Sequence, residues 1–174
     1  PALPSLLAGL GVGAVFGIFN GVLVEYVGVN PLIMTLGTMY IGRGLVNALM
    51  RGERRYGVRV TNAGFLSIGQ TTVGGVYLIF IVMLVIIVAA QLVMMRTRAG
   101  RNLYYIGSNP DAARLVGIKV RRVRLAGFLV CALLAALTGM LMTSYQGTSS
   151  LYMGMNLELQ IIISCLIGGA SIAG

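Results

Sequence analysis

The sequence predicts an all-α protein, a polytopic transmembrane helical bundle that forms one domain over residues 1–174 and holds about five spanning or partly spanning helices. Composition is the first observation, because 57% of the residues are hydrophobic and only 10% are charged, whereas a soluble domain averages about one quarter charged. The second is a series of uncharged runs close to the roughly 20 residues that cross a bilayer. The third is charge placement, since most of the thirteen Lys and Arg residues lie between these runs. A net charge of +9 placed in this way does not indicate nucleic-acid binding.

The first predicted span covers residues 1–24, which carry no charge. Gly9, Gly13, Gly17 and Gly21 recur at every fourth position and form a ridge along one helix face. Small residues let two helix backbones approach closely in lipid. We expect this ridge to pack against another helix of the same chain, and a seam between two subunits is the alternative.

The second predicted helix runs from residue 31 to residue 50, after a short turn at 25–30. Asn30 fits the N-cap position and Pro31 fits the first helical position. Polar groups at membrane depth rarely face lipid, so this helix is expected to line a water-filled path or to pack wholly within protein. The polar side chains concerned are Thr35, Thr38, Arg43 and Asn47.

The remaining apolar runs predict two further spans and a partial one. Residues 76–95 form the most uniform run, and residues 125–145 return across the membrane. Residues 51–59 form a basic turn, and residues 61–75 are too rich in Gly, Thr and Ser to span comfortably. Residues 146–156 form another polar connection. The last helix, 157–166, runs into a Gly-Gly pair and is expected to break before it crosses fully, as half-helices do where backbone lines a cavity.

The orientation follows from residues 96–124, which carry eight of the thirteen basic residues. Short connections rich in Lys and Arg stay on the cytoplasmic side of a membrane, so this segment is predicted to be a cytoplasmic loop. Counting alternate sides then places 25–30 inside, and 51–75 and 146–156 outside. The outer segment 51–75 carries four arginines, fewer than the eight basic residues assigned to the inside.

A short helix is predicted within this loop, at residues 109–118. Asn109 fits its N-cap and Pro110 its first position. Asp111 lies in the first turn, where the helix dipole favours negative charge, and Gly117 lies near the end.

The small side chains of Ala112 and Ala113 would let a partner surface approach this helix closely. The residues alone leave two interpretations open. One is a docking helix, and the other is an interfacial helix whose arginines touch anionic lipid.

Several kinds of chemistry lack the residues that they need. The chain has no His, its four acidic residues are scattered, and Cys131 and Cys165 lie in separate apolar runs, where we expect small buried side chains. No metal site or acid–base pair is therefore predicted. No GxxxxGK[ST] phosphate loop is present either, so we expect no ATP hydrolysis, no enzyme activity and no cofactor in this chain.

Taken together, six stretches resemble the inner-membrane permease subunits of ribose-type sugar ABC importers. The likeness rests on their order and spacing, since each stretch alone is unspecific. They are NGVLV at 20–24, NPLIMTLGTM at 30–39, RGL at 43–45, TRAGRN at 97–102, IGSNPDAARLVGI at 106–118 and IGGAS at 167–171.

The resemblance implies a multi-pass subunit of a bacterial or archaeal plasma membrane. It implies a translocation path for a ribose-like monosaccharide or related polyol, shared with a second permease subunit in a homo- or heterodimer. A cytoplasmic ABC ATPase would bind ATP and Mg, and a periplasmic or extracellular binding protein would deliver the substrate. Complete members have several more helices, so we expect the chain to be a fragment. A permease for branched-chain amino acids and a membrane scaffold or channel without an energy source are the alternatives.

The resemblance also implies site residues. In the family a short loop helix fits a groove on the ATPase, and Asp111 stands where many relatives have Glu. The coupling residues are Asn109, Pro110, Asp111, Ala112, Ala113, Arg114 and Gly117.

Two further groups of residues are predicted from their position. Thr35, Thr38, Arg43 and Asn47 are candidates for the translocation path; alternatively, Arg43 reaches outward or bonds backbone carbonyls. Glu158 is expected to complement a helix dipole as a first-turn acid. Arg51, Arg54, Arg55 and Arg59 are candidates for docking the binding protein, and a solvated charge cluster is the alternative.

Overall fold

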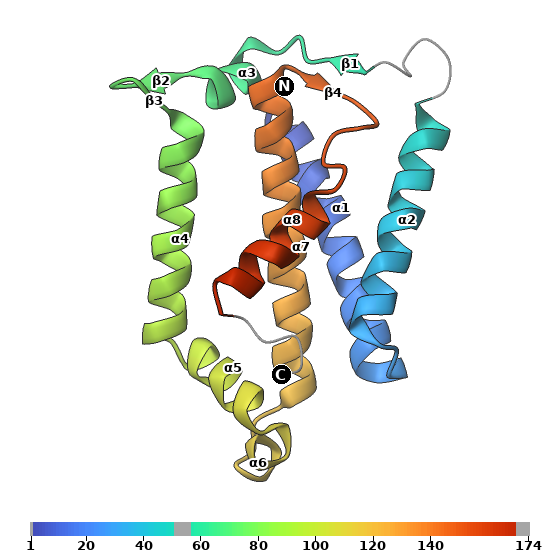
Figure 1. Ribbon diagram of the computed structural model, residues 1–174, viewed down its shortest axis with the longest axis vertical. Coiled ribbons are helices and arrows are strands. Elements are labelled where there is room, and N and C mark those ends of the chain that lie inside the picture. Colours follow the sequence, from blue (N-terminus) through green and yellow to red (C-terminus); the bar gives the residue numbers. More distant parts are fainter. Residues whose placement is uncertain (1, 51–56, 170–174) are drawn as a thin grey trace.

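The computed structural model describes residues 2–50 and 57–169 (Figure 1). Within these residues, four helices are long and apolar enough to cross a membrane, and one shorter apolar helix follows them. The predicted fold class, a transmembrane helical bundle, is confirmed. In chain order the elements are α1 (Ala2–Val22), the π-helix η1 (Leu23–Val27), α2 (Pro31–Leu49), β1 (Val58–Arg59), α3 (Ala63–Gln70), β2 (Thr72–Val73), β3 (Val76–Tyr77), α4 (Leu78–Arg96), α5 (Arg98–Ser108), α6 (Pro110–Leu115), α7 (Val120–Gln146), β4 (Thr148–Ser149) and α8 (Leu157–Ile167).

The long helices run alongside one another, with α7 between α4 and α2, and the connections gather at two ends (Figure 1). One end holds η1, α5 and α6, and the other holds α3 and the short strands (Figure 1). Counting sides predicts this arrangement, in which 25–30 lies at the end of α5 and α6, and β4, within 146–156, lies at the opposite end (Figure 1). Which end faces the cell interior stays a prediction.

The glycine ridge packs against α7, which makes α1–α7 the most extensive contact between two of the described elements. A Cβ atom added at Gly13 would lie 2.7 Å from the Cβ of Ala136, and one added at Gly17 would lie 2.7 Å from the Cβ of Ala132. Such distances leave no room for a side chain, because carbon atoms in contact lie about 3.5–4.0 Å apart. The expected packing within one chain is confirmed.

The basic segment is more helical than predicted, because α7 begins at Val120 rather than at residue 125. Arg121, Arg122 and Arg124 therefore stand on the first turns of α7 and not in a loop. The physical reason is the apolar side chain of Val120, which is buried with that of Ile106 and thereby fixes the position of the helix start.

Helix α5 was not predicted at all. Thr97 caps it, since the Thr97 hydroxyl oxygen accepts from the backbone N–H of Gly100 at 3.2 Å. The high charge of this stretch concealed a short amphipathic helix that buries one apolar side chain, that of Ile106.

At the opposite end, α3, β1 and β4 cover the end of α7, and none of these three elements is predicted from the sequence. Asn62 caps α3 by accepting from the backbone N–H groups of Gly64 and Phe65. Helix α3 lies on α7, because a Cβ at Gly69 would meet the backbone of Ser144 and Tyr145 and the Ser144 hydroxyl donates to the Phe65 carbonyl. Strands β1 and β4 pair antiparallel next to this contact.

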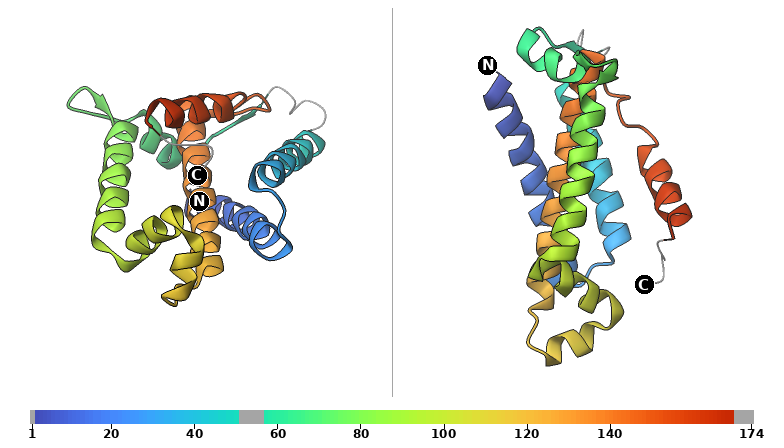
Figure 2. Two further views of the ribbon diagram at one scale, coloured as in Figure 1. Left: turned by 60° about the horizontal axis from the view of Figure 1, so that its bottom comes forward. Right: turned by 90° about the vertical axis from the view of Figure 1, so that its left-hand side faces the viewer.

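Helix α8 is a partial span, as predicted. Its 11 residues extend about 16 Å at 1.5 Å per residue, roughly half of a hydrocarbon core of about 30 Å. It begins after Asn156, which has φ +63°. In Figure 2, α8 lies to one side of the long helices.

The outer surface of the bundle is strongly apolar. Large hydrophobic side chains such as Leu7, Leu49 and Ile87 are exposed along α1, α2 and α4. The expectation that both cysteines are buried is wrong, because Cys131 and Cys165 are exposed. An apolar side chain of a membrane protein can face lipid or a helix of another subunit instead of its own chain. A high share of apolar residues therefore does not predict that each of them is buried within this chain.

Candidate functional site

A cleft of about 1220 Å³ opens between α1, α2 and α7 and is closed on one side by the segment that leads into α8. The four residues predicted for a translocation path come from α2, and all of them line this cleft: Thr35, Thr38, Arg43 and Asn47. The structure thus brings the predicted group together. That these side chains contact a substrate stays a prediction.

An ion pair joins α2 to α8 beside the cleft. One guanidinium nitrogen of Arg43 lies 3.4 Å from a carboxylate oxygen of Glu158, with side chains 36% and 30% exposed. Neither predicted role of Arg43 included this acid, and Glu158 was expected only to complement a helix dipole. The partners are 115 residues apart, so no local sequence pattern could reveal the pair.

The two threonines are less available than the sequence suggested. The Thr35 hydroxyl donates to the Pro31 carbonyl at 2.9 Å, and that of Thr38 donates to the Met34 carbonyl at 3.1 Å. Both protons are thus used within α2, which leaves oxygen lone pairs as acceptors. Thr38 is only 3% exposed, so it belongs to the packed wall of the cleft rather than to its accessible face.

Asn20 is a polar residue of the cleft that the sequence analysis missed. It lines the cleft from α1, and its buried side-chain oxygen has no hydrogen-bond partner among the described residues. A buried acceptor without a donor costs free energy, so such a position needs an explanation. An amide within an otherwise apolar span was the available signal.

The predicted loop helix is present as α6, with the predicted cap. The Asn109 side-chain oxygen accepts from the backbone N–H groups of Asp111 and Ala112 at 3.0 Å each. Pro110 occupies the first helical turn, and Arg114 lies 2.9 Å from the Asp111 carboxylate. Gly117 has φ +82° and ends the turn after the helix, a conformation that favours glycine.

Of the two small residues predicted to let a partner approach α6, Ala112 is exposed and Ala113 is not. Ala113 is 3% exposed and packs with Ile106 and Val120, so the idea that a partner approaches the Ala113 side chain is wrong. Instead, Leu115 is 89% and Val116 is 75% exposed at the tip of the segment. Helical geometry turns Ala113 inward because that face meets α5 and α7, a fact that local sequence does not contain.

Of the arginines predicted to dock a binding protein, Arg51, Arg54 and Arg55 lie outside the described residues. Arg59 is exposed on β1, at the end of the bundle that holds α3.

Each acidic residue that the structure describes forms an ion pair with an arginine. Glu25 lies 3.7 Å from Arg124, Asp111 pairs with Arg114, and Glu158 pairs with Arg43. Across residues 2–50 and 57–169, no group of His, Cys, Asp or Glu side chains could hold a metal ion.

Comparison with known proteins places the chain among membrane permeases. The sequence model of the family described as "Branched-chain amino acid transport system / permease component" matches residues 2–174. The D-allose transport system permease of Escherichia coli K12 is 32% identical over 174 residues, which is 100% of this chain and 52% of the relative. The galactose/methyl galactoside import permease of Haemophilus influenzae is 32% identical over 173 residues, 97% of this chain and 52% of the relative.

The autoinducer 2 import system permease of Klebsiella pneumoniae is 32% identical over 165 residues, 93% of this chain and 50% of the relative. The chain thus spans about half the length of these curated relatives. No solved structure matches it.

Proposed function

The chain belongs to the family of permease components described for branched-chain amino acid transport systems, and we propose that it forms part of the translocation path of an ATP-driven sugar importer. The observation that carries this proposal is the cleft, whose polar groups are amides, hydroxyls and the Arg43 guanidinium, which Glu158 neutralises. A monosaccharide or related polyol offers many hydroxyls and no charge, which such a lining complements. Relatives named for allose and galactose support a monosaccharide as the substrate, and a ribose-like sugar belongs to the same chemical class.

A branched-chain amino acid is the second candidate, and two observations favour it. The family description names this substrate, and the Arg43–Glu158 pair offers one charge of each sign. A zwitterion could insert its carboxylate toward Arg43 and its ammonium toward Glu158. A sugar would need neither charge.

Uptake by the full-length protein separates these candidates. The permease, its ATPase and its binding protein are reconstituted into proteoliposomes, and uptake of labelled ribose, allose, galactose and leucine is measured with and without ATP. The proposal expects ATP-dependent accumulation of a sugar that unlabelled leucine does not compete away. Leucine accumulation would favour the second candidate, and sugar equilibration that ignores ATP would indicate a channel.

Coupling to the ATPase is assigned to the α6 tip. ATP and Mg would be bound by that partner, so that this chain remains a non-enzymatic subunit. Ala113 holds α6 against α5 and α7, while the exposed Leu115 and Val116 offer an apolar knob to a groove on the partner. Removing exposed apolar side chains of this kind from water favours association with an apolar groove. Movement of the knob would tilt α7 through the turn at Gly117.

A substitution at the knob tests the coupling role. Leu115→Asp should lower ATP-driven uptake and co-purification of the ATPase by on the order of tenfold, because it places a charge in an apolar groove. Leu115→Met keeps an apolar side chain of similar size and serves as the matched control. Equal uptake in the Asp and Met variants, at equal membrane levels, would remove this role from the knob.

The remaining partners follow from the same proposal. The exposed apolar faces of α1, α2 and α4 would meet lipid or a second permease subunit in a bacterial or archaeal plasma membrane. Exposed Arg59 and its neighbours Arg51, Arg54 and Arg55 would attract an acidic rim on a binding protein.

A further inference from the structure

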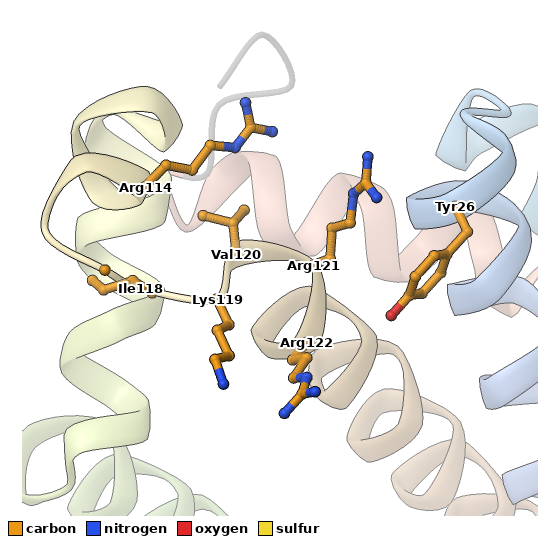
Figure 3. Close-up of a pocket in the computed structure, with 8 residues that line it drawn as sticks. Tyr26, Arg114, Ile118, Lys119, Val120, Arg121 and Arg122 are labelled. Atoms are coloured by element: carbon orange, nitrogen blue, oxygen red, sulfur yellow. The ribbon is translucent and has the colours of Figure 1, made fainter.

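A second pocket, strongly basic, lies at the end of the bundle that holds η1 and α6 (Figure 3). Its volume is about 550 Å³. Tyr26 on η1 forms one wall, and the other wall comes from α6, the turn after it and the start of α7. The basic residues that line it are Arg114, Lys119, Arg121 and Arg122, and none of the described residues in the lining is acidic.

The nearby carboxylates already have partners. The buried Glu25 side chain lies 3.7 Å from Arg124, and Asp111 lies 2.9 Å from Arg114. Over the described ranges 2–50 and 57–169, no carboxylate lies within salt-bridge distance of Lys119, Arg121 or Arg122. Three neighbouring cations without a counter-charge repel one another, so an anion bound among them would be stabilised.

Tyr26 lines the pocket from η1, and its hydroxyl group can donate a hydrogen bond. The guanidinium carbon of Arg121 lies 5.7 Å from the centre of the Tyr26 ring, a cation–π contact that joins η1 to α7. Figure 3 shows the Tyr26 ring reaching from η1 toward the start of α7, with Arg114 and Arg121 on one side of the connecting backbone and Lys119 and Arg122 on the other. Basic side chains therefore lie on both sides of the backbone that faces Tyr26.

The pocket lies where the charged end of the molecule meets its apolar surface. After Arg124, α7 carries no further charge up to its last residue, Gln146. On the facing element, the exposed apolar side chains of Val22 and Val27 flank Tyr26. Tyrosine and basic residues gather at such a boundary because lipid headgroups lie there.

We propose that this pocket binds the phosphate headgroup of an anionic phospholipid, with the acyl chains along the exposed apolar surface of α1. Guanidinium groups donate paired hydrogen bonds to phosphate oxygens, and the Tyr26 hydroxyl can donate another. The apolar wall distinguishes a lipid from free phosphate, which has no chains to bury. It also distinguishes a lipid from an acidic segment of a soluble partner, which likewise has no acyl chains to bury. A bound lipid would join η1 to the junction between α6 and α7.

Native mass spectrometry of the purified full-length protein tests this site. Adducts are counted after adding phosphatidylglycerol or, separately, zwitterionic phosphatidylcholine, which carries the same phosphate without net charge. The triple variant Lys119→Gln, Arg121→Gln, Arg122→Gln should weaken phosphatidylglycerol binding on the order of 100-fold, because each basic group near a membrane surface contributes about a fivefold factor. A control variant, Arg96→Gln, Arg98→Gln, Arg101→Gln, removes the same charge from the same segment outside the pocket and should lower the adducts far less than the pocket variant does.

Other results would overturn the proposal. Equal retention of phosphatidylcholine would show unselective lipid contact, and inorganic phosphate that displaces phosphatidylglycerol at equal concentration would show a free-phosphate site. Loss of ATPase co-purification in the pocket variant with unchanged lipid adducts would assign the pocket to the partner protein. If the triple variant does not fold, Arg122→Gln alone should still lower the adducts about fivefold, and an unchanged count would contradict the site.

Discussion

At the scale of single residues, Arg43 and Glu158 form an ion pair that ties the partial span α8 to the full span α2. An ion pair inside a membrane protein stabilises chiefly by sparing each partner an unpaired charge. Removing one partner is therefore expected to harm the fold more than removing both.

A double-mutant cycle checks this expectation. Arg43→Leu and Glu158→Leu should each lower the thermal stability of the purified protein, whereas the double variant should recover part of the loss because it leaves no unpaired charge. The charge-swapped variant, Arg43→Glu with Glu158→Arg, provides the control for attraction without the original geometry. Strictly additive losses in the double variant would show that the two residues do not interact.

Replacing Asn20 is expected to affect sugar transport without lowering the stability of the protein. Its side-chain oxygen is buried in the cleft wall without a partner, so Asn20→Leu should leave the melting temperature unchanged or raise it, since it removes an unsatisfied acceptor. If the acceptor serves a sugar hydroxyl instead, the same variant should lower sugar uptake several-fold. Unchanged uptake kinetics in a well-folded variant would exclude Asn20 from the path.

At the scale of elements, the structure depends on α1 packing closely against α7. Gly11 and Gly13 offer a matched comparison on α1, since a Cβ at Gly11 would meet nothing within 4 Å and one at Gly13 would lie 2.7 Å from Ala136. Gly13→Ala should destabilise by about 1–3 kcal/mol through overpacking, while Gly11→Ala gains only helix propensity. Thermal unfolding in detergent measures both, and equal melting temperatures would contradict the packing.

The elements also show what a sequence can and cannot reveal. The spans, the Asn30 and Asn109 caps and the α1 glycine ridge were predictable, because each depends on neighbours within a few residues. Helix α5, the cover over α7 and the inward face of Ala113 were not, because they depend on contacts between distant segments. The cleft residues of α2 were found by their polarity, whereas Glu158 could be linked to Arg43 only in three dimensions.

For the whole molecule, the main consequence is a division between two ends. Residues at one end, η1 with α5 and α6, carry the basic pocket and the apolar knob, and the other end carries the α3 cover with Arg59. We propose that the first end faces the cytoplasm, because Lys and Arg are retained on that side of a membrane. Coupling to an ATPase and delivery by a binding protein both require this orientation.

Cysteine accessibility in intact cells tests that orientation directly. In a background in which Cys131 and Cys165 are replaced by alanine, since both are exposed, single cysteines are placed at the exposed positions Ser108 and Thr72. A membrane-impermeant maleimide added to cells with permeable outer layers should label Thr72→Cys and spare Ser108→Cys, and inside-out vesicles should give the reverse. Labelling of Ser108→Cys from outside intact cells would contradict the assigned orientation and, with it, coupling through α6.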